Sequence, residues 1–267
     1  MTGTQPRSTR RPRAVTGAAF FDVDHTLTTS AGLFRFLAYR YAAEARPPHH
    51  YVQERQRLKA MTAAGVRREE TNRAYFALYA GTRTDRIARL ARDWFRAELA
   101  LGGLFNEPVL GRLRAHRASG DLVVLVSGSF PALLEPLLEH VGAHHMLCTE
   151  PEADPLSRTY TGRLVQRPNQ PMIGRAKADA VRLFAAVHRV DLAASTAYGD
   201  HVSDAPLLAS TGSGVVVGRD PELREIGVRA GWRFLPGAPE PPPLPPPPAD
   251  PSARLFALPS PERPRTS

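Results

Sequence analysis

The sequence predicts an α/β protein in which a Rossmann-like core with a parallel sheet is interrupted by a small helical insert. Short apolar runs alternate with helical patterns along most of the 267-residue chain. Because parallel strands are joined by crossover helices, this alternation is typical of a parallel sheet covered by helices on both faces. Residues 34–105 break the alternation with a long, polar stretch of helical period. That stretch is too long for a crossover and indicates an inserted domain.

The apolar runs and helical patterns give the individual elements of the core. Buried strands are predicted at residues 18–24, 121–129, 194–200 and 213–218. Helices that follow strands are predicted at residues 131–140, 174–188 and 205–210. The segment 148–165, CTEPEADPLSRTYTGRLV, has strand-turn-strand character and is expected to form a hairpin on the same edge of the core.

Composition divides the chain into a core, an insert and two tails. The core is expected to comprise residues 16–33 and 106–236, and the helical insert residues 34–105. Residues 1–15 carry arginines and no acids, which predicts a disordered basic arm. Residues 237–267 hold 12 of the 26 prolines and are expected to form a disordered tail of coil or polyproline II.

The formal net charge of +9 does not by itself indicate a nucleic-acid partner. Four of these charges lie in the basic arm, and no pattern of interleaved aromatic and basic residues follows it, so we expect no nucleic-acid binding. Of the 35 basic residues, only Lys59 and Lys177 are lysines. Where arginine is otherwise used throughout, a retained lysine can mark a place that needs a compact point charge.

The chain is expected to be a soluble, cytoplasmic protein. It has no run of 18 apolar residues and no apolar segment of the kind found in signal peptides, so we expect no membrane association. Its single cysteine, Cys148, excludes a disulfide within the chain and agrees with a reducing compartment. The sequence leaves the oligomeric state open.

Acids and hydroxyls follow three of the predicted strands. Asp22 and Asp24 end the first strand, Ser127 ends the second, and Asp200 ends the third, with Asp204 four residues further on. Any one of them is an ordinary turn or helix-capping residue. Active sites of parallel α/β sheets lie beyond the carboxyl ends of the strands, so the set as a whole predicts a site there.

This set of side chains suits a magnesium ion and a phosphate group. The oxygen ligands of Asp22, Asp24 and Asp200 suit Mg²⁺, which keeps water or substrate oxygens as its other ligands. Ser127 and the amides after it precede a predicted helix, and backbone N–H groups at a helix start bind phosphate. Lys177, on another predicted helix, is placed to supply a cation to the same phosphate.

These residues carry a resemblance to a known superfamily. DVDHTLT, VLVSGS, Lys177 within GRAKADA, and YGDHVSDAPLL resemble the four ordered motifs of the haloacid dehalogenase superfamily of phosphohydrolases, over roughly residues 16–236. The position of the insert, the hairpin segment and the ending VVVGRDPELREIGVRAGW resemble its phosphoserine-phosphatase-like branch, subfamily IB. The resemblance implies the fold of this superfamily, with the helical insert as a cap that closes over the substrate.

The resemblance also implies a role for each residue. Asp22 would attack phosphorus and form an aspartyl-phosphate. Asp24 would protonate the leaving alcohol and then activate water, and its backbone carbonyl would bind the metal. Asp200 would complete the metal site, with Asp204 assisting from the same loop. The phosphoryl oxygens would be held by Ser127, Gly128 and Lys177.

The residues that bind the substrate in this branch are matched less well by this chain than the four motifs are. Phosphoserine phosphatases hold the substrate's amino group with a glutamate shortly after the first motif, where this chain has Ala31. The arginine that holds the carboxylate corresponds to Arg73 in EETNRAYFAL, for which an ordinary solvated helix cation is an equal alternative. We therefore expect a small phosphorylated metabolite as substrate, with phosphoserine as one candidate beside phosphorylated amino alcohols, sugars and polyols.

Three hypotheses follow for the function. The first is a Mg²⁺-dependent phosphatase that hydrolyses a small phosphomonoester. The second is a phosphotransferase that passes the phosphoryl group from the same aspartyl-phosphate to an acceptor other than water. The third is a non-enzymatic interaction protein that works through its basic arm and proline-rich tail, and the complete motif set makes it the least favoured.

Overall fold

A computed structural model describes residues 17–246 of the chain. Its core is a six-stranded sheet in the order β3-β2-β1-β6-β7-β8, and every pair of neighbouring strands is parallel. The strands of this sheet are β1 (Ala18–Phe21), β2 (Leu122–Ser127), β3 (His145–Cys148), β6 (Thr196–Gly199), β7 (Ser213–Val217) and β8 (Arg233–Leu235). The predicted α/β class and the parallel sheet are confirmed.

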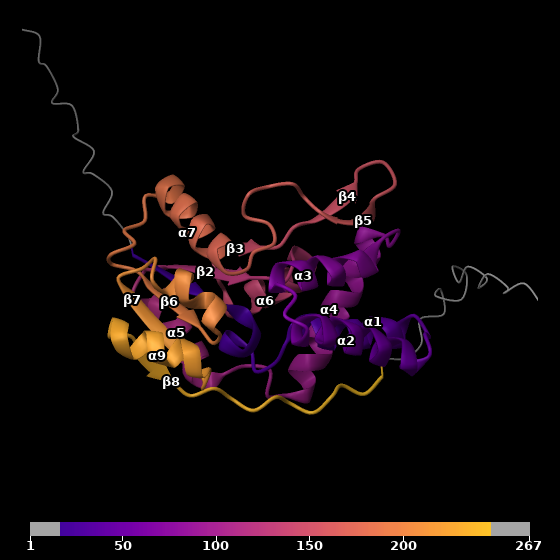
Figure 1. Ribbon diagram of the computed structural model, residues 1–267, viewed down its shortest axis with the longest axis horizontal. Coiled ribbons are helices and arrows are strands. Elements are labelled where there is room, and N and C mark those ends of the chain that lie inside the picture. Colours follow the sequence, from indigo (N-terminus) through magenta and orange to yellow (C-terminus); the bar gives the residue numbers. More distant parts are fainter. Residues whose placement is uncertain (1–16, 247–267) are drawn as a thin grey trace, which may run out of the picture.

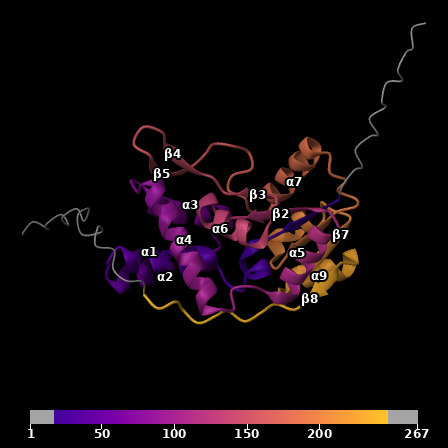
Figure 2. The same ribbon diagram turned by 180° about the vertical axis from the view of Figure 1, so that it is seen from behind.

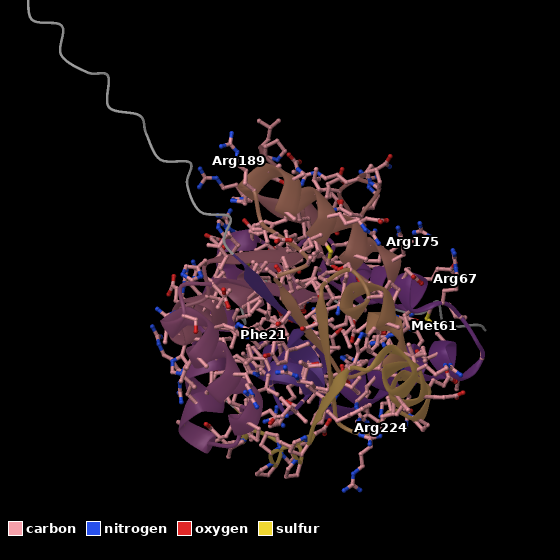
Figure 3. The ribbon with its side chains drawn as sticks, turned by 90° about the vertical axis from the view of Figure 1, so that its left-hand side faces the viewer. Phe21, Met61, Arg67, Arg175, Arg189 and Arg224 are labelled. Atoms are coloured by element: carbon pink, nitrogen blue, oxygen red, sulfur yellow. The ribbon has the colours of Figure 1, made fainter. Side chains whose placement is uncertain are left out.

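Helices cover both faces of the sheet. Successive residues of β1 point to opposite faces, so Ala19 and Phe21 join one hydrophobic cluster and Ala18 and Phe20 the other. The first cluster receives α5 (Glu107–Ala118) and α6 (Pro131–Val141), and the second receives α7 (Arg175–His188), α8 (Ala205–Leu208) and α9 (Pro221–Ala230). Figure 3 shows Phe21 in the interior, whereas Arg189 and Arg224 project outward.

The insert between β1 and α5 is helical, as predicted. It consists of α1 (Gly32–Ala43), α2 (Pro48–Ala63), α3 (Arg68–Phe76), the 3₁₀ turn η2 (Ala77–Tyr79) and α4 (Thr84–Leu101). Figures 1 and 2, seen from opposite sides, both place these helices to one side of the six-stranded sheet. The insert is not packed separately from the core, because α4 contacts α6 and one hydrophobic cluster contains residues of both.

The predicted hairpin forms from β4 (Pro151–Asp154) and β5 (Thr159–Leu164), which pair antiparallel. These strands form a two-stranded sheet of their own and do not extend the six-stranded sheet. The hairpin follows β3, the edge strand, and β5 packs against α3 and η2 of the insert. The hairpin was expected on the edge of the core, but it packs against the insert, where Thr159 also forms an isolated bridge with Arg83.

The observed elements differ from the predicted ones mainly at their ends. The first strand was expected to reach residue 24, but β1 ends at Phe21 and Val23–Leu27 form a turn closed by the Thr28 N–H, which donates to the Val23 carbonyl at 2.9 Å. His25 within this turn has a φ of 60°, a left-handed backbone conformation that a strand cannot contain. The strands β3 and β8 were not predicted, because both are short and neither is a continuous apolar run.

The expected domain boundaries remain predictions. The arm at residues 1–15 and the tail beyond residue 246 lie outside the described residues. Within residues 17–246, no helix is long and apolar enough to cross a membrane.

Candidate active site

The loop after β1 carries the first two acids. The backbone N–H of Asp22 still donates to the carbonyl of Tyr198 at 3.0 Å, so this residue lies at the carboxyl edge between β1 and β6. The turn Val23–Leu27 follows at once, and the Thr28 hydroxyl donates to the Val23 carbonyl at 3.0 Å. The turn directs Asp24 toward the start of α1, where its Oδ1 accepts from the Gly32 N–H at 2.9 Å. The two acids therefore have different surroundings although they are two residues apart.

Lys177 joins Asp22 to Asp204. Its Nζ donates to Oδ1 of Asp22 at 2.6 Å and to Oδ1 of Asp204 at 2.7 Å. All three side chains are at least nine-tenths buried. Burial lowers the pKa of Lys177, but the carboxylates of Asp204 and Asp22 outweigh it and hold the pKa above its ordinary value. The lysine is thus a charged ammonium at neutral pH.

Asp200 lies beside this group at the end of β6. Oxygen atoms of Asp22, Asp200 and Asp204 lie within 4.8 Å of one another. The Thr26 hydroxyl donates to Oδ1 of Asp200 at 3.3 Å, which ties the turn after β1 to the end of β6. Three carboxylates and one ammonium therefore share a small, largely buried volume.

Burial and mutual repulsion raise the pKa values of Asp22 and Asp200. Burial raises the pKa of Asp22 to about 6, with Lys177 opposing the shift and Asp204 adding to it. Burial, followed by the charges of Asp22 and Asp204, raises the pKa of Asp200 to about 8. The single ammonium of Lys177 does not balance three carboxylates, so the cluster favours an added cation.

The residues present fit a divalent metal ion. The available donors are carboxylate oxygens, which hard cations such as Mg²⁺ prefer. Asp22, Asp200 and Asp204 can hold such an ion together. The carboxylate of Asp24 is not in this group, since it accepts from Gly32. Its expected part in the metal site, through the backbone carbonyl, remains a prediction.

Ser127 and Gly128 lie at the same edge of the sheet. Phe21 pairs with Leu125, so Ser127 stands one residue beyond the level of Asp22 in the neighbouring strand. The buried Ser127 hydroxyl accepts from the Ser129 N–H at 3.0 Å, and α6 begins at Pro131. No hydrogen bond joins Ser127 to Lys177 among the described residues, so their joint binding of a phosphate remains a prediction.

Asn72 is a contact to this loop that the sequence did not reveal. It lies on α3 of the insert, and its Nδ2 donates to the Gly128 carbonyl at 3.0 Å. Its Oδ1 is buried without a hydrogen-bond partner among the described residues. The insert therefore reaches the predicted phosphate loop directly. Nothing in the sequence around Asn72 distinguishes it from other polar helix residues.

A small, mostly apolar cavity adjoins Asp24 where the insert meets the core. Its lining includes Trp94 and Phe95 from α4 and Leu133 and Leu137 from α6. Both aromatic residues are buried in the hydrophobic cluster that the insert shares with the core, and they also line this cavity. Burial raises the pKa of Asp24, with the Gly32 N–H opposing the shift. An acid with a raised pKa can keep its proton and deliver it to a leaving group.

Among the described residues, neither Arg73 nor Ala31 hydrogen-bonds to Asp22, Asp200 or Asp204. The guanidinium of Arg73 is exposed and donates to the Gln170 carbonyl at 2.8 Å. Arg68, five residues earlier on α3, donates from Nη1 to the Ser203 hydroxyl at 3.0 Å, and its charge opposes the raised pKa of Asp24 and of Asp200. Ala31 precedes α1 and lines a hollow between α1, α2 and the segment after β8. The substrate-binding role of Arg73 remains a prediction.

The fold and the site together define an α/β enzyme that works at the carboxyl ends of its strands. Residues 19–209 match the sequence model of the haloacid dehalogenase-like hydrolases. The match covers more than half of the chain, so the protein belongs to this family. The predicted family and the predicted hydrolase class are confirmed, and the inserted helices agree with the fold seen in related structures.

Among curated proteins, the chain is similar to phosphoserine phosphatase SerB1 of Mycobacterium tuberculosis. The two are 26% identical over 236 residues, which span 84% of this chain and 71% of that protein. A protein of unknown function from Bordetella pertussis has a similar structure, with a TM-score of 0.73, 24% identity, and 83% of this chain and 99% of that chain covered. The structure of a phospho-aspartyl intermediate analogue of phosphoserine phosphatase is also similar, with a TM-score of 0.61 and 15% identity. The comparison covers 85% of this chain and 96% of that chain.

Proposed function

We propose that the protein is a Mg²⁺-dependent phosphatase that hydrolyses a small phosphomonoester through an aspartyl-phosphate on Asp22. The observation that carries the proposal is the convergence of Asp22 with Lys177, Asp200 and Asp204 at one buried point. A carboxylate held by an ammonium and facing further acids is suited to nucleophilic attack once a cation balances the charge. Phosphoryl transfer needs mainly such positioning and charge neutralisation.

The reaction has two displacements at phosphorus. In the first, a carboxylate oxygen of Asp22 attacks phosphorus, the bond from phosphorus to the ester oxygen breaks, and Asp24 gives its proton to that oxygen. In the second, Asp24 takes a proton from water as the water oxygen attacks phosphorus, and the bond to Asp22 breaks. Inorganic phosphate leaves and both acids return to their starting states. The raised pKa of Asp24 supports its role as the acid.

The chain's own residues would hold the phosphoryl group and the metal ion. Asp22, Asp200 and Asp204 would hold Mg²⁺, which supplies positive charge next to the phosphoryl oxygens. Lys177 supplies a second, permanent positive charge at 2.6 Å from Asp22. Ser127 and the amide of Gly128 would donate to the phosphoryl oxygens at the start of α6.

The substrate class is a small phosphorylated metabolite. The relative SerB1 is a phosphoserine phosphatase by name, which supports phosphoserine as a candidate. Ala31 offers no charge to a substrate amino group, which supports phosphate esters of alcohols without an amine. The cavity beside Asp24 is lined by Trp94 and Phe95, which can pack against an apolar part of the leaving group.

The test is phosphate release from a panel of phosphorylated metabolites. The panel compares phosphoserine with phosphorylated alcohols that lack an amine, each with Mg²⁺ and with EDTA. We expect turnover that EDTA abolishes and that Asp22→Asn lowers by at least about 10⁴-fold, as for other catalytic nucleophiles. Asp179→Asn, at an exposed acid of α7, is the matched control and should keep its activity. Metal-independent turnover, or full activity of Asp22→Asn, would contradict the proposal.

Oxygen-18 water separates hydrolysis from phosphoryl transfer. Hydrolysis places the label in the released phosphate, because water attacks the aspartyl-phosphate. A phosphotransferase would instead yield a phosphorylated acceptor and little labelled phosphate.

A further inference from the structure

The chain leaves the sheet after β8 and crosses from the core to the insert. Both views show residues 236–246, at the yellow end of the colour scale, running from β8 to the region of α1 and α2 (Figures 1 and 2). Asn106 Nδ2, at the start of α5, donates to the Pro236 carbonyl at 3.1 Å. This contact fixes the beginning of the segment on the core.

The exposure of this segment repeats every three residues. Leu235, Ala238, Pro241 and Leu244 are half-buried, and the eight other residues between 235 and 246 are exposed. Polyproline II has three residues per turn, so one edge of such a helix would face the protein in this pattern. Proline fixes φ near the polyproline II value and biases the residue before it to extended conformations, so the sequence APEPPPLPP favours this form.

Arg35 of α1 binds the backbone of the segment. Its Nη1 donates to the Pro241 carbonyl at 3.3 Å and its Nη2 to the Pro242 carbonyl at 3.0 Å. The same guanidinium is held in place by Glu98, which is fully buried and accepts from it at 2.7 and 2.6 Å. Polyproline II makes no internal hydrogen bonds, so its carbonyls are free to accept from such a fixed donor.

Apolar side chains of the insert and the imidazole of His25 face the segment as well. Leu244 packs against the hydrophobic cluster that the core and insert share. Leu244 also lines a hollow whose lining includes the aromatic side chains of Phe34, Tyr41 and Tyr51. Glu240 lies 3.8 Å from the imidazole of His25, in the turn that follows Asp22. Aromatic-lined grooves with hydrogen-bond donors are a recurrent way of binding polyproline II.

The segment crosses one of the two connections between the core and the insert. These connections are adjacent, since Thr28 and Phe105 form an isolated bridge and the Thr29 hydroxyl donates to the Gly103 carbonyl at 2.7 Å. A side-chain carbon on Gly103 would lie only 3.5 Å from Cβ of Pro241. The segment therefore runs close over the place where the insert could hinge.

We propose that the α1–α2 face of the insert is a polyproline-binding groove and that the chain's own segment Ala238–Leu244 occupies it. The segment is anchored at Asn106 on the core and at Arg35 on the insert, so it ties the two parts together. The docked segment restrains opening of the insert, because opening would stretch this tie or undock it. The proposal concerns a surface outside the carboxylate cluster and stands whether or not the chain is a phosphatase.

Hydrogen exchange on full and shortened chains tests the restraint. A chain ending at Pro236 lacks the docked segment, and a chain ending at Pro246 keeps it and is the matched control. We expect amides of α1 and of the connections at residues 28–32 and 102–106 to exchange at least about tenfold faster in the shorter chain only. In the full chain, Leu244→Asp should have the same effect and Pro239→Asp, at an exposed position, should not. The Leu244→Asp comparison decides the matter if the shorter chain does not fold.

A peptide of residues 237–246 tests the groove itself. It should bind the chain ending at Pro236 and bind the full chain at least about tenfold more weakly, because the attached segment competes at high effective concentration. Equal binding to both chains, or no binding to a folded shorter chain, would overturn the proposal. A full chain that is dimeric and becomes monomeric on truncation at Pro236 would place the segment of a second copy in the groove and overturn the assignment to the same chain.

Discussion

At the scale of single residues, the site depends on a lysine that an arginine cannot replace. The ammonium of Lys177 contacts two carboxylates at 2.6 and 2.7 Å in a buried volume. A planar guanidinium is larger and directs its donors in a fixed fork, so it does not fit between two oxygens that already face one point. This explains why a chain with 35 basic residues and only two lysines has one of them here.

We therefore predict that Lys177→Arg lowers kcat/KM by at least about 100-fold although the charge is kept, comparable to losing a donor to a developing anion. Lys177→Met removes the charge and leaves Asp22 and Asp204 unpaired, which should destabilise the fold by about 3–5 kcal/mol. Steady-state kinetics and denaturant unfolding measure the two effects. Lys59→Arg, at an exposed position of α2, is the control and should change neither. Full activity of Lys177→Arg would contradict this account of the site.

The acids could be predicted from the sequence, whereas Asn72 and Arg68 could not. Asp22 and Asp200 each follow an apolar run, and parallel strands bring such positions to one edge whatever the details of packing. The contact of Asn72 with the Gly128 carbonyl depends on how α3 sits over the core, which no local pattern encodes. The same holds for Arg68, five residues before the predicted Arg73.

At the scale of elements, the turn from β6 to α8 places two of the acids. Asp200 follows β6 directly, and Asp204 returns to Lys177 after a short 3₁₀ turn (Val202–Asp204). The turn passes so close to the strand that a side-chain carbon on Gly199 would lie 2.6 Å from Cβ of Asp204. The strand therefore needs glycine at this position for Asp204 to reach the cluster.

Gly199→Ala should consequently destabilise the protein by about 1–3 kcal/mol, the usual cost of overpacking, and should lower kcat by displacing Asp204. Gly111→Ala on α5 is the matched control, because nothing lies within 4 Å of the added carbon. That substitution should be neutral or slightly stabilising, since alanine favours helix more than glycine does. Thermal unfolding and turnover of both variants check the prediction, and equal behaviour of the two would contradict it.

At the scale of the whole molecule, the acid cluster should make stability depend on pH and on metal. Without metal, the pKa of Asp22 is about 6 and that of Asp200 about 8, compared with about 3.9 for an unfolded aspartate. Between about pH 4 and pH 8, the folded chain therefore binds more protons at these groups than the unfolded chain. The cluster's contribution to stability falls as pH rises through this range.

We predict that the melting temperature of the variant Asp200→Asn responds to pH and to Mg²⁺ differently from that of the parent. In EDTA at pH 8, Asp200→Asn should have a higher melting temperature than the parent. Each kcal/mol of repulsion that the substitution removes should raise the melting temperature by about 2–4 °C. The difference should shrink toward pH 5. Mg²⁺ should raise the melting temperature of the parent at pH 8 more than that of the variant, because the ion binds the folded acids. An Asp200→Asn advantage that is the same at both pH values, or absent at pH 8, would contradict the repulsion described here.

The overall arrangement could be predicted in outline, and the missing parts are those set by tertiary contacts. Alternating runs predicted a parallel sheet with an insert, but the short edge strands β3 and β8 contain polar residues and carry little signal of their own. The hairpin β4–β5 was predicted, whereas its packing against α3 depends on the insert. The tail was expected to be polyproline II or coil, and the contact of residues 241–242 with Arg35 could not be foreseen from composition.

The most direct test of the central proposal is to trap the phosphorylated enzyme. The protein is mixed with Mg²⁺ and a phosphomonoester that it turns over, quenched in acid within the first turnover, digested, and analysed by mass spectrometry. The account predicts one phosphoryl group on the peptide that contains Asp22, lost in the variant Asp22→Asn and sensitive to borohydride, as expected of an acyl phosphate. A phosphoryl group on another residue, or steady turnover with no phosphorylated peptide at any quench time, would contradict it.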